Sequence, residues 1–225
     1  MTLDAQLLID GAWRAAQGGA TAASVNPADG RTIGRYAAAD LTDAHGAIAA
    51  ARRAFERPDW AQAPRLRQQV MLHWADALER KSDELARLLT LENGKVLAQS
   101  RGEMAGAISE IRYYAGLART YPGHVFEVEP GVFSTLIREP AGVAGLIIPW
   151  NAPVVLLIRA LTPALAAGCT VVIKPAPQSA LITAAVIAEL HAVLAPLGDR
   201  VRGVVNLVSE RGHDVAQTLV TSPEV

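Results

Sequence analysis

The sequence has one cysteine, few aromatic residues and almost no net charge. Cys169 has no second thiol to pair with, so the chain contains no internal disulfide. Lys and Arg number 21 against 22 Asp and Glu, with no run of like charge to neutralise phosphates, so we expect no nucleic-acid partner. The 225 residues are 51% hydrophobic with a net charge of -1, which is typical of a soluble chain with a sizeable core.

Long uninterrupted hydrophobic runs are also lacking. The longest apolar stretch, 153–168, is interrupted by Arg159 and Pro163 and is too short to cross a bilayer. Residues 1–5 lack the positive charge and the apolar core of a signal peptide. We therefore expect no membrane partner and a cytoplasmic location.

No metal site is indicated. Five histidines fall at no spacing typical of metal ligands, and we predict no bound metal: His45, His73, His124, His191 and His213. Cys169 opens the apolar stretch 170–173, so we interpret it as a small buried hydrophobe and not as a nucleophile.

Residues 1–122 are predicted to be mainly helical, after an N-terminal segment with short strand-like pieces such as 7–9. The spacing of apolar residues and caps predicts four helices: one capped by Thr42 and ending near Pro58, one beginning close to Pro64, one from Ser82 to Asn93-Gly94, and one from about Gln99 to Leu117. Glu92 and Lys95 flank Gly94, and helix capping is a sufficient interpretation of both.

Residues 123–139 read as a β-hairpin. Strand-like alternation over 125–129 and 132–138 flanks the turn Pro130-Gly131. A two-stranded ribbon is marginal by itself, so its apolar faces are expected to lie on another part of the chain or on another subunit.

Residues 140–225 alternate between strand and helix patterns. Strands are predicted over 143–148, 170–174 and 203–208, and helices over 153–167, 180–194 and 212–220. This order implies an α/β fold with a parallel sheet. Because an unpaired central strand edge is hazardous, we expect the sheet to continue in sequence beyond these residues.

Two of these strands end in residues of reactive character. The first is followed by Pro149-Trp150-Asn151 and the second ends at Lys174-Pro175. The carboxyl ends of parallel strands meet at one edge, where open α/β folds bind their ligands, so we expect one shared site. The glycine fingerprint G-x-G-x-x-G is absent after the first strand, and the residue pattern alone leaves the ligand open.

Several ordered motifs resemble the aldehyde dehydrogenase superfamily and cover nearly the whole chain. They are 9–13 (IDGAW), 26–28 (NPA), 51–55 (ARRAF), 92–95 (ENGK), 113–116 (YYAG), 145–151 (GLIIPWN) and 163–175 (PALAAGCTVVIKP). The resemblance implies an incomplete fold of that family: an N-terminal helical region, a protruding β-hairpin and the first half of a Rossmann-like NAD(P)-binding domain. The catalytic domain is absent from these residues.

The resemblance also implies a mechanism. A cysteine thiolate attacks the aldehyde, hydride passes to NAD or NADP, and a glutamate activates water to release the acid. Asn151 matches the family asparagine whose amide donates to the oxyanion, whereas the nucleophile and the general base lie beyond residue 225. The alternative for Asn151 is a residue that only satisfies turn backbone groups.

The same comparison implies cofactor contacts at the shared edge. Lys174 matches the family lysine that contacts the adenosine ribose, and its alternative is a lysine with a packed stem and a solvated head. The weaker candidates are Ile147, Ile148, Pro149 and Trp150, for which turn packing is as good an interpretation, and Gly212, one of two usual glycines in its loop.

Three departures from the family pattern bear on the site. Pro177 stands where a glutamate often binds the ribose, and Glu210 brings a carboxylate near the cofactor that would weaken binding unless Arg211 or a neighbour compensates it. Arg159, among apolar residues, either binds an anionic group of the substrate or reaches an acid at a subunit interface.

Two functional classes follow. The first is the N-terminal part of an NAD(P)-dependent aldehyde dehydrogenase, with a small aldehyde as substrate and a homo-oligomer, dimer or tetramer, as the intact protein. The second is a non-catalytic nucleotide-binding or assembly module derived from that family. Retention of Asn151 and Lys174 favours the first, and Pro177 and Glu210 favour the second.

Overall fold

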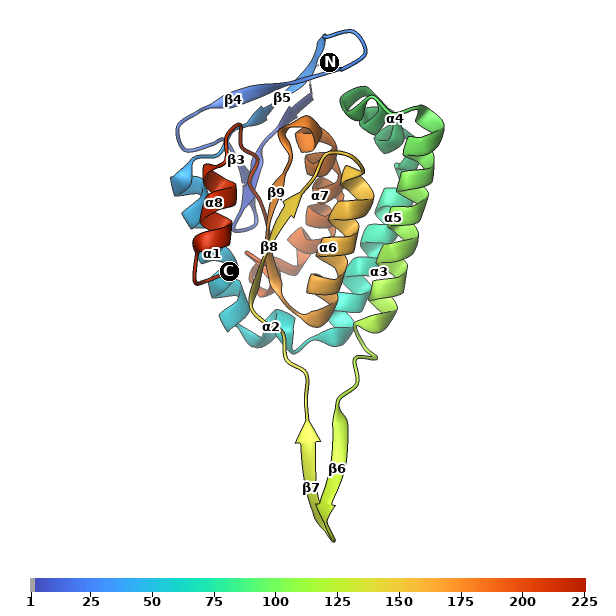
Figure 1. Ribbon diagram of the computed structural model, residues 1–225, viewed down its shortest axis with the longest axis vertical. Coiled ribbons are helices and arrows are strands. Elements are labelled where there is room, and N and C mark those ends of the chain that lie inside the picture. Colours follow the sequence, from blue (N-terminus) through green and yellow to red (C-terminus); the bar gives the residue numbers. More distant parts are fainter. Residues whose placement is uncertain (1–2) are drawn as a thin grey trace.

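The computed structural model describes residues 3–225. Five short strands come first in these residues, followed by five helices, a hairpin and then alternating strands and helices (Figure 1). The strands are β1 (Leu3–Ala5), β2 (Leu7–Ile9), β3 (Ala12–Arg14), β4 (Thr21–Val25), β5 (Thr32–Ala37), β6 (His124–Glu129), β7 (Val132–Leu136), β8 (Val143–Ile148), β9 (Thr170–Pro175) and β10 (Val205–Leu207).

The helices divide into an early and a late group. They are α1 (Leu41–Glu56), α2 (Pro58–Ala61), α3 (Pro64–Arg80), α4 (Ser82–Asn93), α5 (Leu97–Leu117), α6 (Pro153–Ala167), α7 (Ala180–Leu194) and α8 (Asp214–Thr221), with 3₁₀ turns η1 (Pro177–Ser179) and η2 (Ala195–Val201) on either side of α7. The late group alternates with β8, β9 and β10, as the sequence predicted.

The main sheet has five strands in the order β3-β2-β10-β9-β8. β8, β9 and β10 are parallel, whereas β2 runs antiparallel to β10 and pairs with β3. The N-terminal strands therefore cover one edge of the predicted parallel sheet, which the sequence did not predict. At the other edge, β8 pairs with β9 alone among the described residues.

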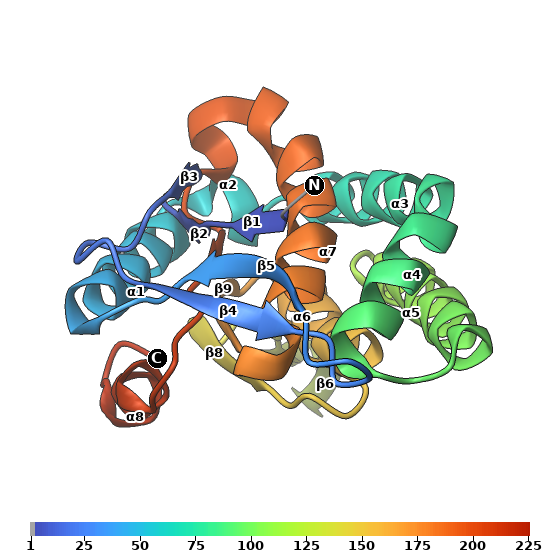
Figure 2. The same cartoon turned by 90° about the horizontal axis from the view of Figure 1, so that it is seen from above.

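Helices cover both faces of this sheet. α1 and α8 contact each other and the strands on one face, and α6 and α7 contact the strands on the other. α3, α4 and α5 pack outside α6 and α7 and form a further layer, which Figures 1 and 2 show from two directions. The carboxyl ends of β8, β9 and β10 stay at the rim of this layered structure, where α6, α7 and α8 begin.

Most predicted element boundaries agree with the structure. β8, α6 and α7 begin and end where predicted, β10 is shorter than 203–208, and α5 begins at Leu97. Thr42 was wrong as the first cap. Asp40 is the N-cap of α1, because its carboxylate accepts from the Asp43 amide while the Asp43 carboxylate accepts from the Asp40 amide.

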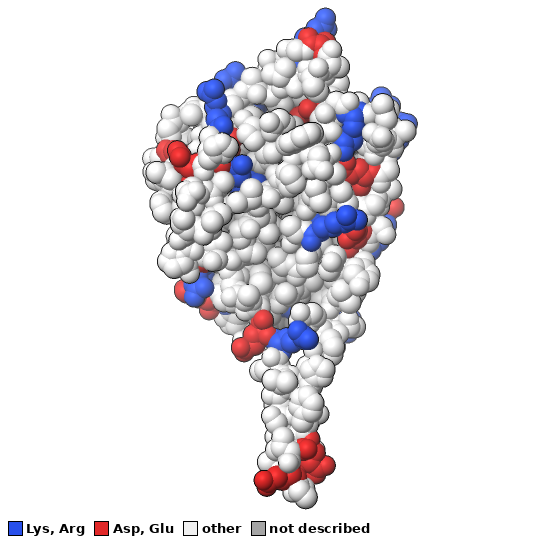
Figure 3. All heavy atoms as spheres, in the orientation of Figure 1, with Lys and Arg blue, Asp and Glu red and all other residues white. Residues whose placement is uncertain are grey.

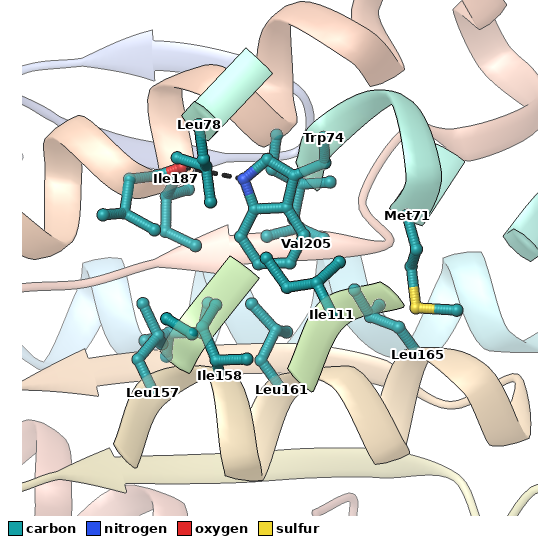
Figure 4. Close-up of a cluster of buried hydrophobic side chains, with 14 of the residues drawn as sticks. Met71, Trp74, Leu78, Ile111, Leu157, Ile158, Leu161, Leu165, Ile187 and Val205 are labelled. Atoms are coloured by element: carbon teal, nitrogen blue, oxygen red, sulfur yellow. Dashed lines mark hydrogen bonds between the residues drawn. The ribbon is translucent and has the colours of Figure 1, made fainter. Parts of the chain in front are cut away.

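The largest hydrophobic cluster lies between the sheet and the outer helices. Trp74, predicted to point inward from α3, is fully buried, and its indole Nε1 donates to the Val186 carbonyl of α7 at 3.2 Å. Figure 4 shows this side chain among residues of four other elements: Ile111, Leu157, Ile158, Leu161, Leu165, Ile187 and Val205. Long-range packing of this kind fixes the helices on the sheet.

The segment Pro177–Val201 is long and apolar enough to cross a membrane by length and composition. It is not one continuous α-helix, because α7 has 15 residues between two 3₁₀ turns and Gly198 adopts a non-helical conformation. A spanning helix needs about 20 apolar residues. The apolar residues of α7 instead pack against α3, α4 and α6 in the core.

The hairpin β6–β7 projects away from the body of the molecule (Figure 1). Every residue of both strands is exposed, including Phe126 and Phe133, and Gly131 has the positive φ of 80° that its turn requires. The expectation that another part of the chain covers the apolar faces is therefore wrong for the described residues. Contact with another subunit stays a prediction.

Replacement of Trp74 by alanine tests the central cluster. Trp74→Ala should lower the free energy of unfolding by about 3–5 kcal/mol, because it leaves a large cavity between α3, α6 and α7. Trp150→Ala, the same change at an exposed tryptophan, should shift it by less than about 1 kcal/mol. Denaturant unfolding measures both, and equal losses would contradict this description of the core.

Candidate functional site

The ends of β8 and β9 lie side by side at the rim of the sheet. Ile147 is opposite Lys174 and Ile148 opposite Pro175 in the parallel register. The loop after β8 carries Asn151, which is exposed, and leads into α6 through Pro153 at the first helical turn. The predicted adjacency of the Asn151 loop and Lys174 is therefore present in the fold.

Two side chains, one at the end of α4 and one in the α4–α5 connection, hold the β8–α6 loop. The Asn93 amide nitrogen donates to the Trp150 carbonyl at 2.6 Å, and the Lys95 ammonium donates to the Asn151 carbonyl at 3.2 Å. Gly94 between them has the left-handed conformation (φ 83°) that was predicted for a helix end. Capping alone was an insufficient interpretation of Lys95, because the side chain reaches the candidate site.

Lys174 is buried, with 7% of its surface exposed, so the interpretation with a solvated head is wrong. Its ammonium lies 3.4 Å from a carboxylate oxygen of Glu210, a residue of the loop after β10. Glu210 is buried as well and also accepts hydrogen bonds from the Val215 and Ala216 amides at the start of α8. The neighbour that compensates this carboxylate is Lys174, and the pair lies within the candidate site.

Glu92 is a third charged group at this rim that the sequence analysis assigned only to capping its own helix. Its carboxylate accepts from the Leu181 and Ile182 amides at the start of α7 and from the Ser24 hydroxyl. Burial raises the pKa of Glu92 to about 7, although the three donors favour the ionised form. The side chain therefore caps α7 and titrates near neutral pH.

The cofactor-contact candidates differ in accessibility. Ile147, Pro149 and Trp150 are exposed, and the space around Gly212 is open. Ile148 is buried, and its carbonyl accepts a hydrogen bond from the Ala176 amide at 2.9 Å. A cavity of about 550 Å³ lies at the same rim and is lined by Trp150, Pro177, Gln178 and the region around Glu92. Asn151 and Lys174 are not among its lining residues.

Two residues that the sequence left open have plain structural explanations. The Arg159 Nε donates to the Glu110 carboxylate of α5 at 2.9 Å, so an acid of the same chain pairs with it, and roles toward a substrate or at a subunit interface stay predictions. Cys169 is buried at the start of β9, and its carbonyl accepts from the Trp60 indole, as expected for a structural thiol.

Charges at the surface are mixed in sign. Figure 3 shows Lys and Arg interspersed with Asp and Glu over the body on the face displayed, with an acidic hairpin tip. Within residues 3–225, no group of three or more His, Cys, Asp or Glu side chains is arranged to hold a metal ion.

These features define a doubly wound α/β protein, a class in which ligands bind at the carboxyl ends of the parallel strands. The sequence profile of the Aldehyde dehydrogenase family matches residues 13–225. The chain is 37% identical to an aminoacetaldehyde dehydrogenase of Pseudomonas aeruginosa, over 100% of this chain and 45% of that protein. It is 36% identical to a betaine aldehyde dehydrogenase of Bacillus subtilis, over 97% of this chain and 44% of that protein.

Solved structures agree with these relatives. A betaine aldehyde dehydrogenase of Staphylococcus aureus in complex with NAD+ matches with a TM-score of 0.93 and 33% identity, over 99% of this chain and 44% of that chain. An NAD-dependent aldehyde dehydrogenase of Sinorhizobium meliloti matches with a TM-score of 0.94 and 32% identity, over 100% and 44%. The chain belongs to the aldehyde dehydrogenase family, has the N-terminal part of that fold, and spans under half the length of these relatives.

The raised pKa of Glu92 predicts a pH-dependent stability. Because the folded state binds this proton more tightly than the unfolded state, its contribution is complete below pH 4.5 and is lost as pH rises through about 7. Above that pH the free energy of unfolding is lower by at most about 3 kcal/mol.

Denaturant unfolding between pH 5 and 8 measures this effect. Glu92→Gln removes the titration and should flatten the dependence, whereas Glu84→Gln, at an exposed carboxylate of the same helix, should leave it unchanged. An identical pH slope in the wild type and Glu92→Gln would contradict the assignment.

Proposed function

We propose that this chain is the N-terminal part of an NAD(P)-dependent aldehyde dehydrogenase that converts an aldehyde to a carboxylic acid. The named relatives act on different aldehydes, among them aminoacetaldehyde, betaine aldehyde and glutarate semialdehyde, so the proposal extends to a small aldehyde and no further. The nucleophilic cysteine and the general base are assigned to sequence beyond residue 225. The observation that carries the proposal is the exposed Asn151 in the loop after β8, whose end pairs with the end of β9.

Asn151 is the proposed oxyanion donor. Attack of a thiolate on the aldehyde carbon places negative charge on the former carbonyl oxygen, which a side-chain amide N–H stabilises. The Asn151 loop is supported by hydrogen bonds to the backbone carbonyls of Trp150 and Asn151, which keep the donor in place before the charge develops. Loss of one such donor costs about 3–4 kcal/mol of activation free energy.

The rim offers an accessible surface for a dinucleotide. Exposed Ile147, Pro149 and Trp150 and the open space at Gly212 fit such a group, with Ile148 contributing through its backbone. When bound, NAD or NADP supplies the hydride acceptor. Lys174 is assigned to the ribose, but its ammonium is shared with Glu210, so it acts as part of a charge pair and not as a free cation.

The charge pair also supports a second candidate function, a non-catalytic nucleotide-binding or assembly module. Lys174 is already neutralised by Glu210, and Pro177 offers the ribose no hydrogen bond. Both features weaken cofactor binding. The exposed oxyanion donor, for which a module has no chemical use, favours the enzyme.

The intact protein is proposed to be a cytoplasmic homo-oligomer. A projecting hairpin whose apolar side chains are all exposed is an unusual feature of a monomer, because such surfaces favour association. The strands β6 and β7 are the proposed contact, and the partner is a second copy of the protein.

The oxyanion assignment is tested in the complete polypeptide that contains this chain. Asn151→Ala should lower kcat by about 10²–10³ for aldehyde-dependent formation of NADH or NADPH, because the charge on oxygen loses its donor. Gln69→Ala, an amide deletion at an exposed position of α3, is the control and should leave kcat unchanged. A wild-type polypeptide that binds the dinucleotide without oxidising any aldehyde would favour the module.

The hairpin contact predicts a change of mass in solution. Phe133→Asp should shift the protein to a smaller species in light scattering, because a carboxylate would be buried at the proposed interface. Tyr113→Asp places the same charge at an exposed aromatic position of α5 and should not change the mass. An unchanged mass in Phe133→Asp would exclude this hairpin as the contact.

A further inference from the structure

A largely buried ion pair joins α5 to the candidate site. Lys95, in the α4–α5 connection, donates to the Glu103 carboxylate of α5, with 13% and 7% of the two side chains exposed. Two charges removed from water persist only where further hydrogen bonds use their remaining donors and acceptors. The further partners of this pair lie in the β8–α6 loop and in the first turn of α6.

Glu103 uses its second oxygen at the start of α6. That oxygen accepts from the Val154 amide at 2.8 Å and from the Val155 amide at 3.2 Å. The helix needs this external acceptor, because its N-cap residue Ala152 has no side chain that could cap and Pro153 has no N–H. Glu103 is thus the cap of α6, supplied from another helix.

Lys95 uses a second proton on the loop itself, at the Asn151 carbonyl. The peptide before it is held by Asn93, which donates to the Trp150 carbonyl. The carbonyls of Trp150 and Asn151, which precede and follow the Asn151 nitrogen, are therefore both held by side chains of the short segment 93–95. The Asn151 side chain makes neither of these bonds and remains exposed.

We propose that Lys95 and Glu103 are positioning residues for the Asn151 amide, an inference that rests on the proposed function of Asn151. The pair clamps the residue from both directions: Lys95 fixes its carbonyl, and Glu103 fixes the helix that begins two residues later. The direction of the side-chain amide follows from the backbone held between them. A misplacement of about 1 Å at a reacting group costs about 10²-fold in rate, so a clamp of this kind acts on kcat.

A purely structural ion pair would act differently. The Lys81–Glu189 pair, 2.7 Å apart, is such a case: it joins the residue between α3 and α4 to α7 and holds no backbone of the β8–α6 loop. Lys81→Met is the control for removal of a lysine from a Lys–Glu pair between distant elements. The Lys81 side chain is 49% exposed and that of Lys95 is 13% exposed, so the Asn151 background and the amide exchange described below separate loss of the loop contact from loss of a buried charge.

The first arm of the test is kinetic and uses the complete polypeptide. Lys95→Met should lower kcat by about 10–10²-fold with a change of less than about threefold in the KM for aldehyde and the Kd for cofactor. Lys95→Arg, which retains donors for both acceptors, should recover most of the rate, and Lys81→Met should match the wild type. Glu103→Gln keeps an acceptor for α6 but loses the charge, and should resemble Lys95→Met with a smaller effect.

The decisive measurement is a double-mutant cycle. If Lys95 acts through Asn151, Lys95→Met should have little further effect on kcat in an Asn151→Ala background. Fully additive losses would overturn the proposal, because they would mean that Lys95 acts elsewhere. An equal fall of kcat in Lys81→Met would also overturn it.

The second arm does not require activity. Amide hydrogen exchange should show about tenfold faster exchange of Val154 and Val155 in Lys95→Met and Glu103→Gln, and no change there in Lys81→Met. Unchanged exchange at these amides overturns the clamp. A wild-type polypeptide without aldehyde oxidation would reject the proposed function, whereas the exchange result would still decide whether the pair positions the loop.

Discussion

Three helices begin at the carboxyl edge of the sheet, and none of them carries a side-chain cap of its own. The N-cap residues of α6, α7 and α8 make no side-chain cap hydrogen bond. Each first turn instead donates to a glutamate outside the helix: Glu103 of α5 for α6, Glu92 of α4 for α7, and Glu210 of the preceding loop for α8. Because free N–H groups at a helix start need acceptors and favour negative charge, this constraint organises the whole rim.

The three carboxylates set the electrostatics of the site. Glu103 and Glu210 each have a lysine beside them, Lys95 and Lys174, and both pairs are largely buried. Glu92 has hydrogen-bond donors but no paired lysine, and burial raises its pKa to about 7. The rim therefore combines two Lys–Glu ion pairs with one carboxylate of raised pKa. Both lysines are engaged by carboxylates of the protein itself, whereas Arg211, next to Glu210 in the loop after β10, is exposed.

The sequence predicted the alternating part of the fold well, because its information is local. The strand 143–148, the helices 153–167 and 180–194, and the glycine end at residue 94 have strong apolar periods or turn residues. β2 and β3 could not be assigned to the main sheet from sequence, since β2 pairs with a strand nearly 200 residues away. The strand that leads to Asn151 and the strand that ends at Lys174 are neighbours, as the sequence predicted, whereas the contacts of Lys95 and Glu103 were missed.

The sequence by itself determined the family, the order of the late strands and helices, and the position of Asn151 after β8, because motifs and periodicity are properties of neighbouring residues. Only the tertiary structure decided that Glu103 caps α6 and Glu92 caps α7, and which lysines pair with Glu103 and Glu210. Those partners come from separate elements, such as Lys174 on β9 and Glu210 after β10. A hydrogen bond between them depends on packing of the whole core, which no local pattern specifies.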